Sequence, residues 1–514
     1  MTRVQNYLNH LFLILTYAIL TFTSPCYGMP EPDIAVSGWN HSPISLEGTA
    51  PPEWLGNDPV IGRLLCPPVS RVLLDEQRSD GLIFSKVSVS HPDTNQPTWN
   101  YHLRTGIYWW DGNEVSPKDL ADFYQANITS VVAHISGGTW KVPPHKITAS
   151  DKIISIKWQD KPSFGPYIWN GVPLYRSRPQ TDTNHPYAWE CAGIYRPQST
   201  PGSNFNLEPT PGYLSKRVPI VFHPKTTPTE PKIAKRTLHF RMPEEFGVDP
   251  STRPPTKPVQ CTNPILTPFV TGILWNPGRT MIQNPEVRKA LTMLLPRKTL
   301  LESGAGYAGA MLPTLIPKIH PGHPREIQEL PFSLVKSSEI LTKLGYIRPK
   351  GDRERLNKKG KPIELKFATL LPKPGIVEKV IADTFLSIGI SVEFFPVQAK
   401  IPNTQDFDAV LLGFRLPWPE MNLLPSMHPD SKLALPFTLK KDDTFIAYLE
   451  DYARSMTQEQ VEPQKIAPII QFLTETEPVS ILMQHRACLI DSKYNKLAPI
   501  REQNPDWFRK IISI

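Results

Sequence analysis

The chain has 514 residues, of which 40% are hydrophobic and 20% charged, and its formal net charge is +8. This length and composition predict a globular protein of two or three domains and exclude a disordered chain. Lys and Arg are spread along the sequence instead of clustering in arms or stripes, which argues against nucleic-acid binding. Proline is frequent, at 58 residues, and predicts stiffened connections between elements.

The first 28 residues have the layout of a secretory signal. Arg3 precedes an apolar run from Leu11 to Phe22, and the small-residue site Cys26-Tyr27-Gly28 follows. The run is shorter than the about 20 residues that span a bilayer. We therefore predict cleavage after Gly28 and secretion into the periplasm, in preference to an uncleaved anchor or a lipoprotein that begins at Cys26.

Beyond the signal, cysteines and histidines suggest disulfides and not a metal site. The remaining cysteines are Cys66, Cys191, Cys261 and Cys488. An even set in an oxidising compartment predicts disulfides, whose connectivity the sequence leaves open. None has CxxC spacing, and their wide separation argues against a metal, although His485 is close to Cys488. His320 and His323 are the nearest approach to a ligand pair, but the adjacent prolines predict a turn.

The first part of the mature chain favours strands followed by a helix. Asp33 to Val36 predicts a short strand, and apolar residues recur nearly every second position from Trp99 to Tyr108. Trp110-Asp111-Gly112-Asn113 predicts a tight turn, because glycine tolerates positive φ. Ser116-Pro117-Lys118-Asp119 predicts the start of a helix, with a serine N-cap, a proline in the first turn and an early acidic residue.

The middle of the chain, residues 197–258, is rich in Pro and Thr and predicts a connecting region with one clear strand at Arg236–Arg241. Two amphipathic helices follow. The first has one apolar face, formed by Val287, Ala290, Leu291, Leu294 and Leu295, and the second, with Leu334, Leu341 and Leu344, ends at Gly345.

A βαβ unit is predicted next. Ile363 to Thr369 alternates as a strand, an amphipathic helix runs from Val377 to Gly389, and Ile390 to Phe394 alternates again. Phe407 to Leu412 predicts a further buried strand, so the second half contains an α/β domain with partly parallel pairing. The basic patch from Arg353 to Lys361 predicts a solvated loop.

Four segments resemble, in the same order, the motifs of the family 5 extracellular solute-binding proteins, which include oligopeptide-, dipeptide- and nickel-binding proteins. Leu103 to Leu120 resembles the family signature at every fixed position. The second, Glu286–Leu291, is similar to a "VRxAL" helix, although Pro296 stands before Arg297 where an Asp is usual. The third, Leu341–Tyr346 with Gly360–Ile363, is similar to "LLxxAGY … GKPL". The fourth, Ile388–Glu393 with Phe407–Phe414, is similar to "GIxVE … YDAxLxGW".

The resemblance implies an α/β, two-lobed periplasmic binding protein of the class II type, with a ligand cleft between lobes that close by hinge motion. It also implies three domains after the signal peptide at 1–28. These are a discontinuous domain I (29–40, 191–271 and 485–514), an inserted domain II (41–190) and an α/β domain III (272–484).

The implied function is the substrate-binding component of an ABC transporter, which captures a peptide or peptide-like ligand and delivers it to an inner-membrane permease. We expect a monomer without a cofactor. The sequence has no Gly-x-Ser-x-Gly or His-Glu-x-x-His motif, so an enzyme is not expected. Alternatives are a non-transport peptide chaperone or ligand sensor on the same fold, or a binder of a nickel complex, a glutathione-like molecule or haem. The sequence leaves the ligand and the existence of a cognate permease open.

The resemblance places ligand contacts after the Phe407 strand. Peptide-binding members carry a Trp at the position of Phe414 and, three residues later, an Asp that pairs with the peptide α-ammonium group. That position is Pro417, and a buried ammonium needs a carboxylate. Glu420 is one substitute, and Arg415 would instead favour an anionic group. Trp418 suits ligand stacking or loop packing.

Three aromatic residues elsewhere are further candidates. Trp109 and Trp110 would point to opposite faces of a strand, so at most one is expected in the core and at most one in the cleft. Tyr195 lies where domain I is expected to resume, after Cys191.

Overall fold

The computed structural model describes a large part of the chain, and the predicted signal lies outside that part. The described residues are 34–39, 64–177, 188–197, 205–213, 220–224, 236–241, 264–303, 309–310, 314–316, 320–324, 326–327, 330–369, 375–397, 406–416, 421–432, 434 and 442–491. None of the helices in these ranges has the length and hydropathy needed to cross a membrane.

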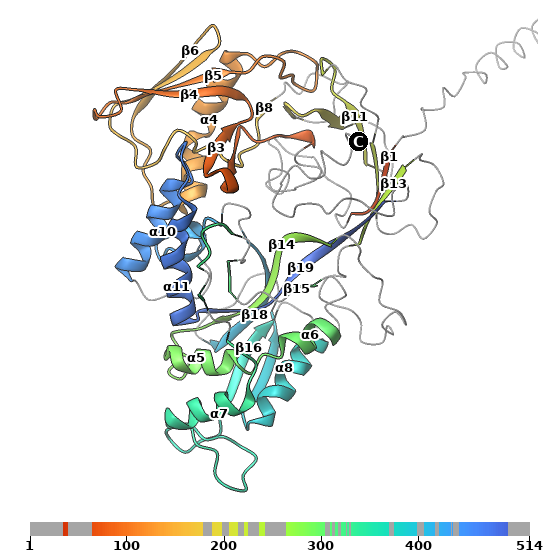
Figure 1. Ribbon diagram of the computed structural model, residues 1–514, viewed down its shortest axis with the longest axis vertical. Coiled ribbons are helices and arrows are strands. Elements are labelled where there is room, and N and C mark those ends of the chain that lie inside the picture. Colours follow the sequence, from red (N-terminus) through yellow and green to blue (C-terminus); the bar gives the residue numbers. More distant parts are fainter. Residues whose placement is uncertain are drawn as a thin grey trace, which may run out of the picture.

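An upper lobe is built on a small antiparallel sheet (Figure 1). Its strand order is β4-β5-β7-β6, formed by β4 (Phe84–Ser90), β5 (Thr98–Leu103), β7 (Ile153–Trp158) and β6 (His145–Ser150). One long helix, α4 (Pro117–Ser136), packs on the sheet. Beside them lie β2 (Ser70–Leu73), a 3-10 turn (Leu74–Glu76), β3 (Arg78–Gly81) and the pair β8 (Tyr175–Ser177) and β9 (Trp189–Cys191).

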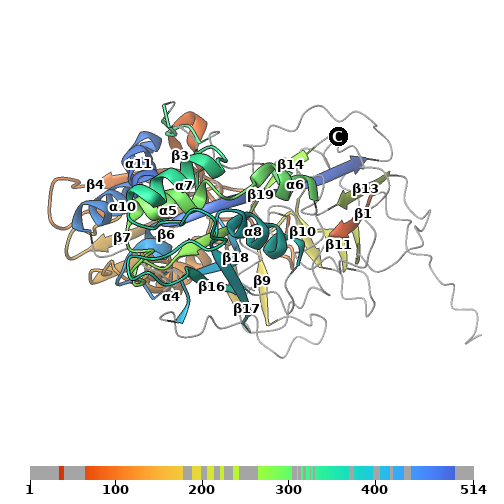
Figure 2. The same ribbon diagram turned by 90° about the horizontal axis from the view of Figure 1, so that it is seen from below.

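A larger mixed sheet runs through the rest of the molecule (Figure 2). Within the described residues its order is β10-β11-β12-β1-β13-β19-β14-β18-β16-β17, and β15 also pairs with β19. The strands are β1 (Ile34–Trp39), β10 (Tyr195–Pro197), β11 (Phe205–Pro209), β12 (Ile220–Pro224), β13 (Arg236–Arg241), β14 (Pro264–Trp275), β15 (Gly309–Ala310), β16 (Glu364–Thr369), β17 (Ser391–Pro396), β18 (Ala409–Arg415) and β19 (Val479–Asp491).

The lower lobe contains the predicted βαβ unit. Strand β16 pairs in parallel with both β17 and β18, and α8 (Ile376–Ser387) connects β16 to β17. Gly389 ends α8 with a φ of +86°, in agreement with the glycine stop. The helices α5 (Pro285–Thr292), α6 (Arg297–Ser303) and α7 (Leu334–Lys343) complete this lobe, and the strand predicted at Arg236–Arg241 is confirmed as β13.

The predicted helix start at Ser116 is confirmed in detail. The Ser116 hydroxyl accepts from the Asp119 backbone N–H, and the Asp119 carboxylate accepts from the Ser116 N–H, so the two residues form a capping box. Gly112 has a φ of +90° in the predicted turn. The preceding strand is shorter than predicted: β5 ends at Leu103, because the chain turns away through the exposed Gly106, whose φ is +75°.

Two large hydrophobic cores organise the described residues, and a small third cluster lies on β14, β16 and β18. The lower core combines apolar residues between 273 and 411 with Leu482 and Met483. The upper core combines residues 69–192 with Val270, Leu315, Ile316 and apolar residues between 416 and 481. The segment 421–476 includes α9 (Leu424–Met427), α10 (Asp443–Ser455), a 3-10 turn (Pro463–Ile466) and α11 (Ala467–Thr476).

Hydrogen bonds join this late segment to the upper lobe. Asn170 Nδ2 donates to Met456 O at 2.7 Å, and the Val461 N–H donates to Gln77 O at 2.8 Å. Figure 1 accordingly shows α10 and α11, near the end of the chain, beside the upper lobe that is built early in the chain. The late segment and the upper lobe bury apolar side chains against each other and so share one core, although about 300 residues separate them in sequence. The three domain boundaries drawn from the sequence remain a prediction.

Arg355 corrects the prediction that the whole basic patch is solvated. Its side chain is 1% exposed, because its guanidinium fills the space between the ends of two helices. It donates to Ile388 O at the end of α8 and to Tyr346 O just after α7. The carbonyls at a helix C-terminus lack intrahelical donors and attract a positive charge, which explains why an arginine is stable at this buried position.

Candidate functional site

Strand β18 passes from one hydrophobic core to the other. Ala409 and Leu411, early in the strand, belong to the lower core. Leu416, directly after the strand, is buried in the upper core. The residues between them, which include Phe414 and Arg415, therefore lie where the two lobes meet.

The neighbouring strand β14 makes the same passage. Ile273 belongs to the lower core and Val270 to the upper core. The antiparallel register places Val270 opposite Phe414 and Phe269 opposite Arg415. The backbone of two of the predicted ligand contacts is thus fixed by a paired strand at the junction. The other three predicted residues of this stretch, Pro417, Trp418 and Glu420, lie outside the described residues.

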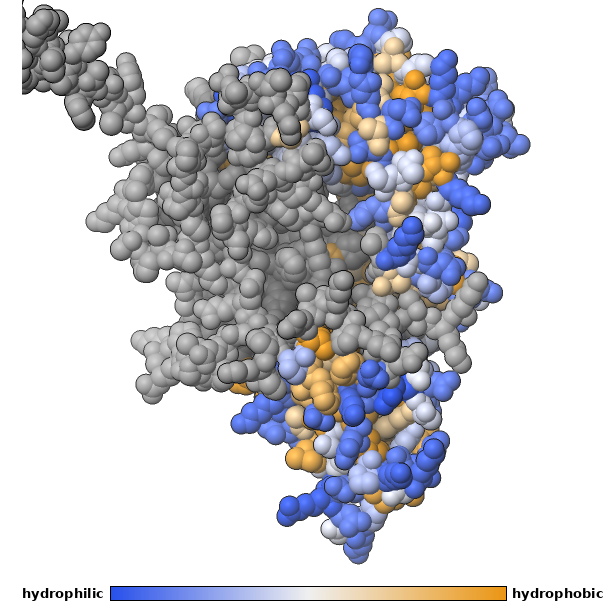
Figure 3. Space-filling model, turned by 180° about the vertical axis from the view of Figure 1, so that it is seen from behind, coloured by the Kyte–Doolittle hydropathy of each residue, from blue (hydrophilic) through white to orange (hydrophobic). Residues whose placement is uncertain are grey.

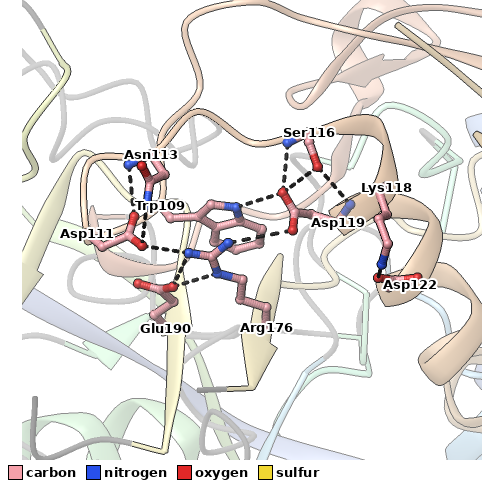
Figure 4. A network of polar contacts seen from close by, with 9 residues as sticks. All are labelled: Trp109, Asp111, Asn113, Ser116, Lys118, Asp119, Asp122, Arg176 and Glu190. Atoms are coloured by element: carbon pink, nitrogen blue, oxygen red, sulfur yellow. Dashed lines mark hydrogen bonds and ion pairs between the residues drawn. The ribbon is translucent and has the colours of Figure 1, made fainter. Parts of the chain in front are cut away.

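Trp109 lies in a network of polar contacts in the upper lobe, shown in Figure 4. Its indole N–H donates to Asp119 Oδ2 at 3.3 Å, and the Arg176 guanidinium lies over its ring, 4.6 Å from the centroid. Arg176 also pairs with Asp111, at 2.8 Å, and with the buried Glu190. A third carboxylate, Asp119, lies 3.6 Å from the same guanidinium. One arginine thus joins three carboxylates and an aromatic face, which is the kind of multiple contact that a planar guanidinium supports.

The charge of Asp119 is stabilised within this network. Burial alone would raise the pKa of the Asp119 carboxyl, but hydrogen bonds from Ser116 and Trp109 and the positive charge of Arg176 outweigh it and lower that pKa. Trp109 itself is completely buried, with its face and its N–H both engaged. The network fixes the loop between β5 and α4, and its chemistry is structural.

Trp110 corrects the expectation that only one of the two tryptophans can be buried. Its indole N–H donates to Leu65 O at 3.2 Å, and its ring lies 5.2 Å from that of Trp189, so both tryptophans are buried. The expectation assumed a strand, whereas residues 109 and 110 lie in the loop and turn that follow β5. Alternation of side chains across a sheet does not apply in such a loop.

Tyr195 is buried in β10, close in sequence to a disulfide. The structure pairs Cys66 with Cys191, both buried, across a sequence separation of 125. Cys261 lies outside the described residues, and Cys488 lies in β19, where only the backbone is described. In the described part of the chain, no group of three His, Cys, Asp or Glu side chains is placed to hold a metal ion.

His320 and His323 form the predicted turn, in which the His323 N–H donates to His320 O at 2.9 Å. The His320 ring is buried and its two nitrogens are occupied: Nδ1 accepts from the Gly322 N–H, and Nε2 lies 3.0 Å from the Tyr452 hydroxyl. An Nδ1 acceptor requires a neutral ring with the proton on Nε2. Burial, with a smaller effect of His323, lowers the pKa of His320 to about 4.

This pKa predicts an acid-sensitive contribution to stability. The unfolded chain protonates His320 near pH 6.5 and the folded chain near pH 4, so the unfolded state binds more protons between these values. Stability is therefore retained above pH 6.5 and falls towards pH 4, by up to about 3 kcal/mol. Urea unfolding from pH 7 to pH 4 should show a shallower decline for His320→Gln than for wild type. Parallel pH curves for the two proteins would contradict this assignment.

The network around Arg176 and Glu190 was not found from the sequence. Neither residue belongs to a recognisable motif, and the aspartates that pair with Arg176, Asp111 and Asp119, are more than 50 residues away from it in the chain. Such a pairing is a tertiary contact, and no local spacing signals it.

Comparisons with known proteins agree with this architecture. A model of the family described as "Bacterial extracellular solute-binding proteins, family 5 Middle" matches residues 31–429. No curated protein matches significantly in sequence.

Several solved structures share the fold. A nickel ABC transporter protein from Bacillus halodurans is 16% identical, with a TM-score of 0.64 over 93% of this chain and 98% of that one. NikZ from Campylobacter jejuni, in complex with Ni(L-His), is 13% identical, with a TM-score of 0.62 over 91% and 95%. The oligopeptide-binding protein AppA from Bacillus subtilis, in complex with a nonapeptide, is 15% identical, with a TM-score of 0.55 over 89% and 95%.

Proposed function

Because the chain belongs to the bacterial extracellular solute-binding proteins of family 5, we propose that it captures a peptide or peptide-like ligand between its lobes and delivers it to an inner-membrane ABC permease. Members of this family are non-enzymatic binding components of ABC importers and act in the periplasm. The chain is accordingly a solute-binding protein and not an enzyme. The peptide, the cognate permease, the monomeric state and the cleaved signal are our proposals.

The observation that carries the proposal is the course of β18. Its last residues, Phe414 and Arg415, lie between a lower and an upper core, and β14 holds them in register. A segment of this kind, which belongs to both lobes, is in a position to contact a ligand enclosed between them. The segment that follows, from Pro417 to Glu420, supplies the remaining predicted contacts.

The chemistry of this segment favours a peptide held mainly by its backbone. With Pro417 in place of an aspartate, a peptide amine lacks its usual carboxylate partner, and we assign Glu420 as the substitute. Trp418 and Phe414 offer apolar faces for side chains. Among proteins of the same fold, one binds a nonapeptide and another Ni(L-His), so the fold accepts ligands of both kinds.

Pro417→Asp is expected to strengthen binding of peptides with a free amino terminus by about tenfold or more, because it adds a charge-assisted hydrogen bond. Isothermal titration with one peptide, free and N-acetylated, measures the effect. The acetylated form should gain nothing, and Pro417→Asn, which adds a polar group without a charge, should give a smaller gain. An equal gain for both peptides would place residue 417 away from the ligand amine.

Native mass spectrometry of the protein from a periplasmic extract tests the proposed ligand directly. A distribution of peptide masses bound to the protein is the expected result. A single non-peptide mass would instead support a dedicated carrier of another small molecule. A ligand-free protein that gains no protection from peptide pools would contradict transport of peptides and favour the chaperone or sensor.

The second candidate is a small anionic ligand or complex, favoured by Arg415. A guanidinium at the lobe junction would bind a carboxylate in bidentate fashion. Arg415→Gln would then abolish retention of the co-purified molecule, whereas capture of a peptide by its amine would be unchanged or improved.

A further inference from the structure

The loop between α7 and β16 forms the lower end of the molecule (Figure 1). Figure 3 shows this end covered largely by hydrophilic side chains. From residue 343 to residue 361 the exposed side chains include seven cations against two carboxylates, a net charge of +5. The cations are Lys343, Arg348, Lys350, Arg353, Lys358, Lys359 and Lys361, and the acids are Asp352 and Glu354. More than half of the chain's formal net charge of +8 is therefore concentrated in one short segment.

This basic tip, residues 343–361, has a defined conformation. Ile347 and Leu356 form an antiparallel bridge, and Leu356 forms another with Pro362. The Asn357 side chain accepts hydrogen bonds from the backbone N–H groups of Lys359 and Lys361, which closes the turn between Leu356 and Pro362. The buried Arg355 fixes the centre of the loop to the ends of α7 and α8. These bridges and hydrogen bonds fix the backbone that carries the exposed cations.

Exposed apolar side chains accompany the charges. The Arg348 guanidinium donates to Ser387 O at 3.0 Å, which joins the tip to the end of α8. Two apolar side chains lie next to this bond in sequence and are unusually exposed. Ile347, which precedes Arg348, is 55% exposed, and Leu386, which precedes Ser387, is 59% exposed. A surface that combines lysines and arginines with protruding aliphatic groups suits the boundary between anionic headgroups and acyl chains.

We propose that the basic tip binds the surface of an anionic phospholipid bilayer. The cations attract the headgroups over a Debye length, and Ile347 and Leu386 enter the boundary region at contact. This docking holds the protein at the membrane by its lower end. It uses no residue of the lobe junction, so it is independent of which ligand the protein carries.

Co-sedimentation of the full chain with phosphatidylcholine vesicles, with and without phosphatidylglycerol, tests the proposal. Binding is expected only with phosphatidylglycerol, and it should weaken as salt rises. Each cation close to an anionic membrane contributes about fivefold to binding. The triple variant Lys350→Gln, Lys359→Gln and Lys361→Gln is therefore expected to bind at least about tenfold more weakly.

A matched control removes the same charge from the other end of the molecule. Lys146, Lys152 and Lys157 are exposed on or beside strands β6 and β7 of the upper lobe. Their replacement by Gln should leave vesicle binding within about twofold, because these side chains lie outside the tip. Equal losses in both triple variants would mean that only the overall charge attracts the protein, and the proposal would be overturned.

The apolar part of the surface has a separate test. The double variant Ile347→Ser and Leu386→Ser should lose binding severalfold at low and at high salt, whereas the effect of the charge variant should shrink as salt rises. Absence of binding to phosphatidylglycerol vesicles at low salt would refute the docking surface. Competition by an acidic protein but not by these vesicles would assign the tip to a protein partner instead. Ligand binding should be unchanged in every tip variant, which separates this test from that of the proposed function.

Discussion

Alanine in place of Arg288 is expected to lower the free energy of unfolding by about 4 kcal/mol, because several buried carbonyls would lose their donor. The Arg288 side chain is almost completely buried, and its guanidinium closes the C-terminal end of α11. It donates to Thr476 O at 2.8 Å and to Glu477 O at 3.1 Å, and also to Ile282 O and Gln283 O. Burial lowers the pKa of Arg288 to about 10, so the guanidinium remains charged at neutral pH.

Urea unfolding at pH 7 measures this loss. Lys289→Ala, at the next position, removes an exposed ion pair with Glu286 and should cost under about 0.5 kcal/mol. Arg288→Lys should be intermediate, since an ammonium keeps the charge but cannot reach all four carbonyls. A loss below about 1 kcal/mol for Arg288→Ala would show that water replaces the guanidinium at this helix end.

Removal of the Cys66–Cys191 disulfide is expected to cost about 4 kcal/mol, because the bond closes a loop with a sequence separation of 125 and long loops gain most from closure. The double variant Cys66→Ala and Cys191→Ala should unfold at a lower urea concentration than wild type. Reductant should lower the wild-type midpoint to that of the variant and leave the variant unchanged.

Unfolding in the presence of reductant also tests whether Cys66–Cys191 is the one disulfide that contributes to stability. Both cysteines are buried, so reduction should require unfolding and be slow in native buffer. A further drop in the variant's midpoint with reductant would reveal a second disulfide, for which Cys261 and Cys488 are the available residues. No difference between wild type and variant would mean that the loop is already restricted in the unfolded state.

Local patterns were sufficient for much of the fold. The capping box at Ser116, the glycine that ends α8 and the alternating strands around it depend on residues close in sequence, so their signals are complete within a short window. The ordered motifs then indicated the family, and the family model confirms it. The "VRxAL" motif also has a physical explanation, because its arginine is Arg288.

Other features depend on contacts between residues that are far apart in the sequence. The charge run around Arg355 predicts solvent exposure, and only the meeting of two helix ends makes a buried guanidinium favourable there. Trp110 is buried by Leu65 and Trp189, each more than 40 residues away. In the candidate site, the sequence located the β18 segment, but the passage of that strand between two cores follows from packing alone.

The shared upper core also constrains the order of events after synthesis. Its apolar residues extend from Val69 to Ile481, so the early sheet and α4 lack a large part of their packing surface until almost the whole chain is present. For an exported chain, the upper lobe would complete its core only after the last helices have crossed the membrane. A secretory intermediate halted near residue 420 would therefore still expose apolar surface, and would be a substrate for periplasmic chaperones and proteases.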